Sequence, residues 1–239
     1  MKSRVEDLRK RGKFYEEDIE QIKDLQEEDL MELIDSPVAA TRSAAVHILS
    51  QRGFINQVEF VGKLLLQLTN EKCLYTKIEI CEALEQGDSK AAANMVEYLS
   101  RISKNQHVSL PDKVSRKISY PCPRDIIARS LGRMNPSILP VLIEVLYSGD
   151  TDRIPEVLDA IGRMVFYNQD LVNHELLQHI TKTMDTYVTN IIIYWKCVLC
   201  LSAFPLQETK DILKLIIATN EFEIIQCEAK RSLNLIRTT

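Results

Sequence analysis

The feature that most constrains the fold is a short helical motif that recurs along the chain. Its clearest copy is the segment 123–134, PRDIIARSLGRM. At helical spacing, one face of this segment carries only apolar side chains, namely Ile127, Ala128, Leu131 and Met134. A single helix cannot bury such a stripe by itself, so the neighbouring copies must supply the packing partners. The sequence therefore predicts a repetitive, all-helical protein.

Two aligned columns of residues follow this recurrence through the chain. The last core position of each copy is a leucine or isoleucine: Leu49, Leu84, Leu131, Ile161, Leu201 and Leu233. One helical turn earlier, four positions back, the residues are small or apolar: Ala45, Ile80, Ile127, Val157, Cys197 and Ala229. Successive copies are 30 to 47 residues apart. We therefore expect about six helical hairpins that bury both columns.

Turn signals divide the chain into a cap and an array. Residues 1–26 are dense in charge and are expected to form an N-terminal capping segment, with a helical stripe over 5–25, and residues 27–239 to form the repeats. In the third hairpin, the first helix is expected over 91–103 and the second over 125–134. The polar stretch between them, residues 105–123, contains prolines and is an insertion that the helices do not require.

Composition limits the classes of partner. The chain has 30 basic and 34 acidic residues and a net charge of -4, so no global positive charge attracts nucleic acid or acidic lipid. Its apolar runs are far shorter than the roughly 20 residues of a membrane span. The first 13 residues are polar and basic, unlike a signal peptide, and most of the six cysteines lie in apolar helical patterns. We expect reduced cysteines and a cytoplasmic location.

The sequence offers little for catalysis or metal binding. Cys197 and Cys200 form a C-x-x-C, but apolar residues surround the pair, which favours core packing over redox or metal chemistry. His174 and His179 are five positions apart, so one helical face does not carry both. Phosphate-binding loops, nucleophile elbows and paired catalytic carboxylates do not occur as motifs. We therefore predict no catalytic, cofactor or metal-binding residues.

Three segments carry a resemblance to a known family. They are TRSAAVHIL at 41–49, RDIIARSLG at 124–132 and AIGR at 160–163. These segments resemble HEAT repeats, including the short variety of phycobilin lyases and related bacterial proteins, and the resemblance covers residues 27–166 best. It implies a right-handed α-α superhelix of antiparallel helix pairs whose second helices line a concave face. The sequence departs from a regular HEAT array in one respect. The position seven residues before the last core residue is basic only in the first three repeats, at Arg42, Lys77 and Arg124.

The function expected from these observations is a non-catalytic scaffold that binds a protein or peptide partner on its concave face. The insertion adds basic and hydroxyl-bearing residues suited to an acidic peptide or a phosphate, although an idle loop is the alternative interpretation. The candidate partner-binding residues are Lys113, Arg116, Lys117, Tyr120, Arg124, Arg129, Arg133 and Arg163.

A HEAT-like DNA-binding protein, of the DNA-glycosylase type, is the alternative function. The basic groove of such a protein would be resembled by Trp195 with Arg124, Arg129, Arg133, Arg163 and Lys196. Acidic residues interrupt that groove at 79, 82 and 85 and again at 150–159. Because affinity for the DNA backbone grows with each aligned cation, this interruption argues against duplex binding. The oligomeric state stays open.

Overall fold

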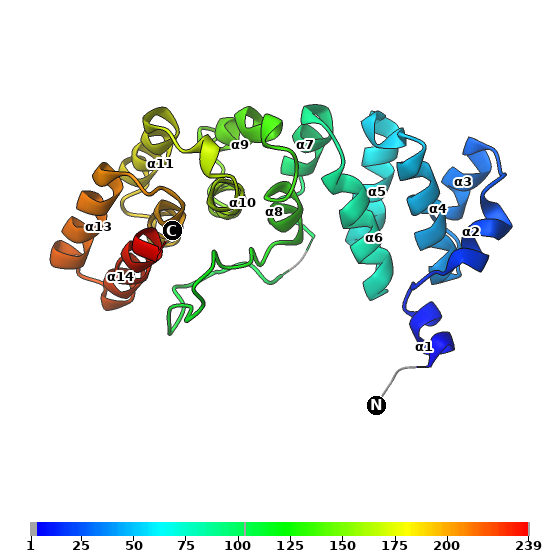
Figure 1. Ribbon diagram of the computed structural model, residues 1–239, viewed down its shortest axis with the longest axis horizontal. Coiled ribbons are helices and arrows are strands. Elements are labelled where there is room, and N and C mark those ends of the chain that lie inside the picture. Colours follow the sequence, from blue (N-terminus) through cyan, green and yellow to red (C-terminus); the bar gives the residue numbers. More distant parts are fainter. Residues whose placement is uncertain (1–3, 103, 239) are drawn as a thin grey trace. The chain divides into compact units, whose positions relative to one another are not determined.

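The structure is a computed structural model that describes residues 4–102 and 104–238 (Figure 1). Within these ranges the chain forms 14 α-helices and four short 3-10 helices and contains no β-strand. The predicted all-helical class is therefore confirmed. The residues cluster into two compact units, unit 1 (Met1–Tyr98) and unit 2 (Leu99–Thr239).

Unit 1 consists of two helical hairpins preceded by two short helices. The hairpins are α3 with α4 and α5 with α6; α4 also packs against α6 and α2, and α5 against α7. The predicted N-terminal stripe is split at Gly12, whose positive φ of 93° fits a turn that glycine adopts readily. The bounds are α1 (Val5–Lys10), α2 (Glu16–Ile22), α3 (Glu27–Leu33), α4 (Ala39–Gln51), η1 (Phe54–Asn56), α5 (Val58–Asn70), α6 (Leu74–Glu85) and α7 (Ser89–Val96).

Unit 2 contains the remaining elements, which form three hairpins after a first single helix. The hairpins are α9 with α10, α11 with α12 and α13 with α14. The bounds are α8 (Ile126–Leu131), η2 (Pro136–Ile138), α9 (Leu139–Leu146), α10 (Ile154–Tyr167), η3 (Gln169–Leu171), α11 (His174–Thr186), α12 (Ile191–Cys200), η4 (Leu201–Ala203), α13 (Gln207–Thr219) and α14 (Glu223–Thr238).

The second helices of unit 2 form one layer. Helix α10 lies between α8 and α12, and α12 lies against α14, so the four helices follow one another in chain order (Figure 1). The residues of the aligned columns fall on these helices and on α4 and α6 of unit 1, except Leu201, which lies in η4 directly after α12. Every residue of both columns is buried, with exposures of 0% except for 7% at Leu233. The predicted register is thereby confirmed.

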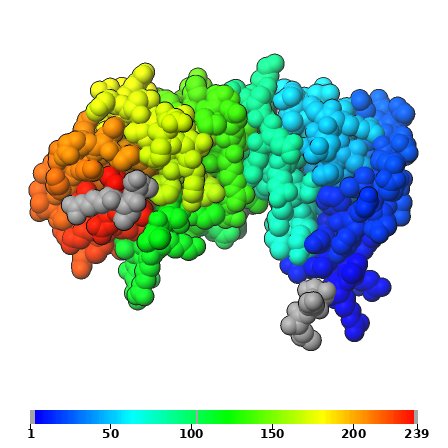
Figure 2. Space-filling view, in the orientation of Figure 1, coloured from blue at the N-terminus to red at the C-terminus, as the bar shows by residue number. Residues whose placement is uncertain are grey.

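The chain between α7 and α8 is longer and more irregular than the sequence predicts. Helix α7 ends at Val96 and not near residue 103, and the described residues from 97 to 125 form turns, bends and extended chain. Ser100 adopts a left-handed conformation with φ of 65°, which is incompatible with a continuing helix. We call residues 104–124 the long loop. In the space-filling view it protrudes beside α14 (Figure 2).

No helix in the described part of the chain is both long enough and apolar enough to cross a bilayer.

Candidate functional site

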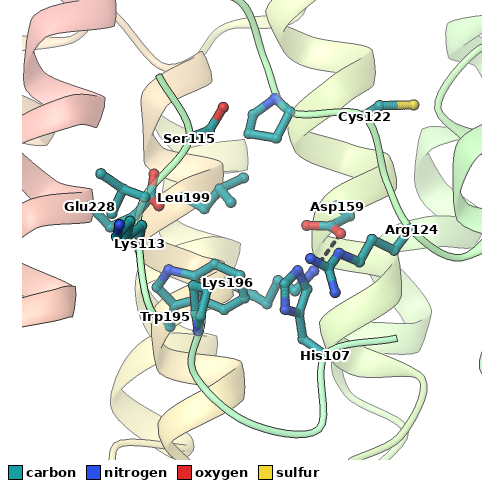
Figure 3. A pocket seen from close by; sticks show the side chains of 13 residues that line it. His107, Lys113, Ser115, Cys122, Arg124, Asp159, Trp195, Lys196, Leu199 and Glu228 are labelled. Atoms are coloured by element: carbon teal, nitrogen blue, oxygen red, sulfur yellow. Dashed lines mark hydrogen bonds and ion pairs between the residues drawn. The ribbon is translucent and has the colours of Figure 1, made fainter. Parts of the chain in front are cut away.

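The candidate site is a cavity in unit 2 between the long loop and three helices. It has a volume of about 220 Å³ and is partly open to solvent. The long loop supplies one wall, and the opposite wall comes from α10, α12 and α14 (Figure 3). The polar and aromatic lining residues are His107, Lys113, Ser115, Cys122, Arg124, Asp159, Trp195, Lys196 and Glu228.

Asp125 fixes one end of the long loop. Its carboxylate is fully buried, and one of its oxygens accepts hydrogen bonds from the backbone N–H groups of Ile127 and Ala128, at 2.8 and 2.9 Å. This is an N-cap of α8. The other oxygen accepts from the backbone N–H of Ser100 at 3.1 Å and from the side-chain amide of Gln106 at 2.7 Å. One side chain therefore joins the start of α8 to Gln106 at the beginning of the long loop and to Ser100, which precedes the loop.

Tyr120 anchors the loop near its C-terminal end by packing into the core. The side chain is 2% exposed, and its ring lies 5.8 Å from that of Phe166. A Cβ at Gly162 would lie 2.0 Å from the Tyr120 hydroxyl, so the absence of a side chain at that position admits the ring. The sequence analysis placed Tyr120 among the surface residues that contact a partner, and its burial corrects that placement. The backbone carbonyl of Ser119 accepts from Arg231 of α14 at 3.0 Å.

An ion pair between α10 and α12 forms the floor of the cavity. The ammonium of Lys196 donates to Asp159 at 2.5 Å, and the two residues are 1% and 5% exposed. Burial raises the pKa of Asp159, and the charge of Lys196 opposes this change. A second buried pair, Arg231 with Glu228 at 2.8 Å, lies within α14. Both acidic groups that line the cavity are thus already paired with cations.

Glu156 lies one helical turn from Asp159 and has an unusual protonation equilibrium. It is 2% exposed, and one carboxylate oxygen has no hydrogen-bond partner among the described residues. Burial raises the pKa of Glu156 to about 7; Lys196 opposes the shift and Asp159 adds to it. Near neutral pH the side chain is therefore present in both protonation states.

His107 and Trp195 form the aromatic part of the cavity. Their rings meet edge to face at 4.7 Å, and the Lys196 ammonium lies 5.2 Å from the indole centre. Burial, together with the charges of Lys196 and Arg124, lowers the pKa of His107 to about 4, so the imidazole is neutral at pH 7. Trp195 is 3% exposed, and its indole N–H has no acceptor among the described residues.

The other predicted partner-binding residues lie in different environments. Lys113, Arg116, Lys117, Arg124 and Arg133 are exposed, and of these Lys113 and Arg124 line the cavity. Arg129 instead donates twice to the backbone carbonyl of Pro123, at 3.0 and 3.2 Å. Arg163 stacks over the ring of Tyr167 at 5.0 Å. The structure therefore brings together only two of the eight predicted residues at the cavity.

The cysteine and histidine motifs behave as core and surface residues. Cys197 and Cys200 are free thiols with 0% exposure, which confirms the predicted packing role, and burial raises the pKa of both. His174 and His179 have separate partners, Glu208 and Tyr147. No cluster of metal-ligating side chains occurs in the part of the chain that the structure describes.

Sequence reasoning missed most of the cavity. Asp159, His107, Glu228 and Asp125 were not proposed as site residues, and Lys196 and Trp195 were considered only for DNA binding. One signal was present: Lys196 is the single charge in the apolar helix IIIYWKCVLC. A lone cation in such a helix needs a buried counter-charge. Which acidic residue supplies that charge depends on how α10 packs against α12.

These features define unit 2 as an all-helical unit with a polar cavity walled by a long loop. Among solved structures, the chain is similar to an engineered protein known from its crystal structure, with 17% sequence identity and a TM-score of 0.38. The match covers 90% of this chain and 99% of that chain. No family model matches the chain, and no match was found among the curated proteins.

Proposed function

We propose that the protein is a non-catalytic scaffold of the HEAT-repeat type that binds a protein or peptide partner. In this proposal the hairpins form a right-handed superhelix, and α8, α10, α12 and α14 line its concave face. Two observations support it: the second helices of unit 2 lie side by side in chain order, and every residue of the two aligned columns is buried. A cytoplasmic location belongs to the proposal, since all six cysteines are free thiols.

The observation that carries the proposal is the cavity between the long loop and the second helices. A scaffold that only needs to be stable gains nothing from a partly open, polar cavity, whereas ligand sites are typically concave with a few convergent polar groups. The long loop also presents Val108 and Ile118 at 93% and 89% exposure, more than any other large apolar residue in the described chain. Apolar side chains next to a cavity are typical of surfaces that a protein partner covers.

Partner capture with matched charge variants tests this function. Arg124→Glu reverses an exposed cation at the cavity, and Lys214→Glu reverses an exposed cation on α13, outside the cavity lining. Proteins retained by the immobilised wild-type chain and identified by mass spectrometry should be lost with Arg124→Glu and kept with Lys214→Glu. Equal retention by both variants would remove the cavity from the proposed function.

Duplex DNA is the alternative partner, and the same variants address it. The cation on the floor of the cavity, Lys196, is buried and paired with Asp159, so it does not present a free charge to a phosphate. We expect no retention of a labelled duplex at low salt. Retention that falls steeply as salt rises, and that Arg124→Glu weakens, would favour the DNA-binding alternative over a protein partner.

A further inference from the structure

The most informative atom of the cavity is the indole nitrogen of Trp195. The N–H group is buried and has no acceptor among the described residues, and a buried donor without a partner is unfavourable. In the close view the indole lies between Lys113 and His107 along the cavity wall (Figure 3). An acceptor that enters the cavity would satisfy this donor.

The charges of the cavity favour an acceptor with a negative charge. Asp159 is paired with Lys196, and Glu228 is paired with Arg231. Arg124 forms no ion pair with any described residue, and it lies close enough to lower the pKa of His107 by its charge. Lys113 adds a second exposed cation at the rim. Hydrogen bonds between such cations and a carboxylate are charge-assisted and therefore strong.

The remaining lining selects the kind of anion. Pro111, Val114, Pro121, Leu199 and the face of Trp195 make much of the wall apolar. A volume of about 220 Å³ is far above the roughly 10–15 Å³ that one water molecule needs, so a larger group fits. A phosphate would leave these apolar surfaces without contact, whereas a carboxylate next to an apolar side chain would use both parts of the wall.

We infer that the cavity of unit 2 binds the free C-terminal carboxylate of a partner chain whose last side chain is apolar. The Trp195 indole N–H and the Arg124 guanidinium donate to the carboxylate, Lys113 contributes charge at the rim, and the apolar side chain packs on Leu199 and Trp195. This inference rests on the proposed binding function and names the part of the partner that the site recognises.

A titration of the single tryptophan tests the inference. Because Trp195 is the only tryptophan in the chain, its indole N–H gives one unambiguous NMR signal. We expect N-acetyl-leucine, the minimal C-terminal residue, to shift this signal with a dissociation constant of roughly 1 mM, whereas N-acetyl-leucinamide, which lacks the carboxylate, leaves it in place. Inorganic phosphate and N-acetyl-aspartic acid N-methylamide, an internal acidic residue, should bind at least about tenfold more weakly.

A matched pair of loop variants completes the test. Arg124→Gln should weaken N-acetyl-leucine binding by about tenfold or more, the effect of losing one charged hydrogen bond. Lys117→Gln removes an exposed cation of the same loop that does not line the cavity and should leave binding unchanged. Thermal melting checks that both variants fold.

The outcomes separate the inference from the proposed function. An indole signal that does not move, or that moves equally with the amide, phosphate or the internal aspartate, would overturn the inference. If partner capture is nevertheless lost with Arg124→Glu, the proposed binding function stands. Only the inferred recognition of a C-terminal carboxylate is then wrong. If capture is indifferent to Arg124→Glu, the cavity has no part in the proposed function and the inference fails with it.

Discussion

The polar groups buried between second helices differ sharply between the two units. Between α4 and α6 of unit 1, Ser43 and Thr76 share a hydrogen bond of 2.9 Å, and Arg42 of α4 binds both oxygens of Glu71, at the end of α5, at 2.9 Å. In the described chain, all seven buried side-chain atoms without a hydrogen-bond partner lie in unit 2. They include atoms of Tyr120, Glu156 and Trp195, which lie at or near the cavity.

This difference shows that packed helices can enclose either paired or unpaired polar groups. A fully paired polar group between helices fixes their register at little cost, whereas an unpaired one costs free energy and persists where function requires it. Unit 1 therefore serves as the reference with paired buried groups, and unit 2 is where the proposed function places its site. Substitutions of buried residues should reveal the contrast.

The largest effect is expected from Leu131→Asp in α8. Leu131 is fully buried, so the variant loses apolar packing and buries an unpaired carboxylate, which should cost more than about 5 kcal/mol. Thermal melting should show loss of the unit 2 transition. Leu215→Asp is the matched control, since Leu215 on α13 is 63% exposed and should tolerate the change. An unchanged melting curve for Leu131→Asp would show that the register of α8 is wrong.

The second-largest loss of stability is expected from Lys196→Met in α12. This change leaves the Asp159 carboxylate buried without its counter-charge, which should destabilise unit 2 by about 3–5 kcal/mol. Urea unfolding measures the loss. Adding Asp159→Leu should recover most of the stability, because it removes the unpaired charge. If the single and double variants unfold alike, the ion pair does not hold the cavity floor together.

A pH-dependent effect is expected from Glu156→Gln in α10. The pKa of Glu156 is about 7 in the folded chain against 4.5 ordinarily, so the unfolded chain loses this proton first as the pH rises. Glu156 therefore lowers stability progressively between pH 4.5 and 7. We expect Glu156→Gln to be more stable than wild type by roughly 2–3 kcal/mol at pH 8 and similar to it at pH 4. Urea unfolding at both values measures this, and a difference that does not depend on pH would contradict it.

The smallest effects compare one hydroxyl in each unit. The Tyr120 hydroxyl in unit 2 is buried without a partner, so Tyr120→Phe should stabilise by up to about 1 kcal/mol. The Ser43 hydroxyl in unit 1 is buried and hydrogen-bonded, so Ser43→Ala should destabilise by about 1 kcal/mol. Denaturant unfolding measures both. Changes of the same sign would show that the units do not differ in the satisfaction of their buried polar groups.

The sequence predicts the helices and their buried faces well because that information is local. The spacing that places Ile127 and Leu131 on one stripe acts within a few residues, and the structure buries both. The insertion predicted over residues 105–123 falls within irregular chain that extends from residue 97 to 125. Short polar segments with proline identify such a loop without any knowledge of what it contacts.

The candidate site was predicted poorly because its contacts join distant segments. Tyr120 of the long loop is buried because Gly162, on α10, leaves room for its ring. His107 meets Trp195 through the path of the long loop, and the partner of Lys196 depends on the packing of α10 against α12. Residue type alone placed Tyr120 and Arg129 on the surface, and tertiary contacts placed Tyr120 in the core and joined Arg129 to Pro123.

The double use of the Asp125 carboxylate links the loop mechanically to the helix layer. One oxygen caps α8, and the other accepts from Gln106, the neighbour of His107 in the cavity wall. A ligand that displaces His107 would pull on Gln106 and so disturb the first turn of α8. Displacement of His107 would then weaken the hydrogen bonds that hold the N–H groups of Ile127 and Ala128 in the first turn of α8.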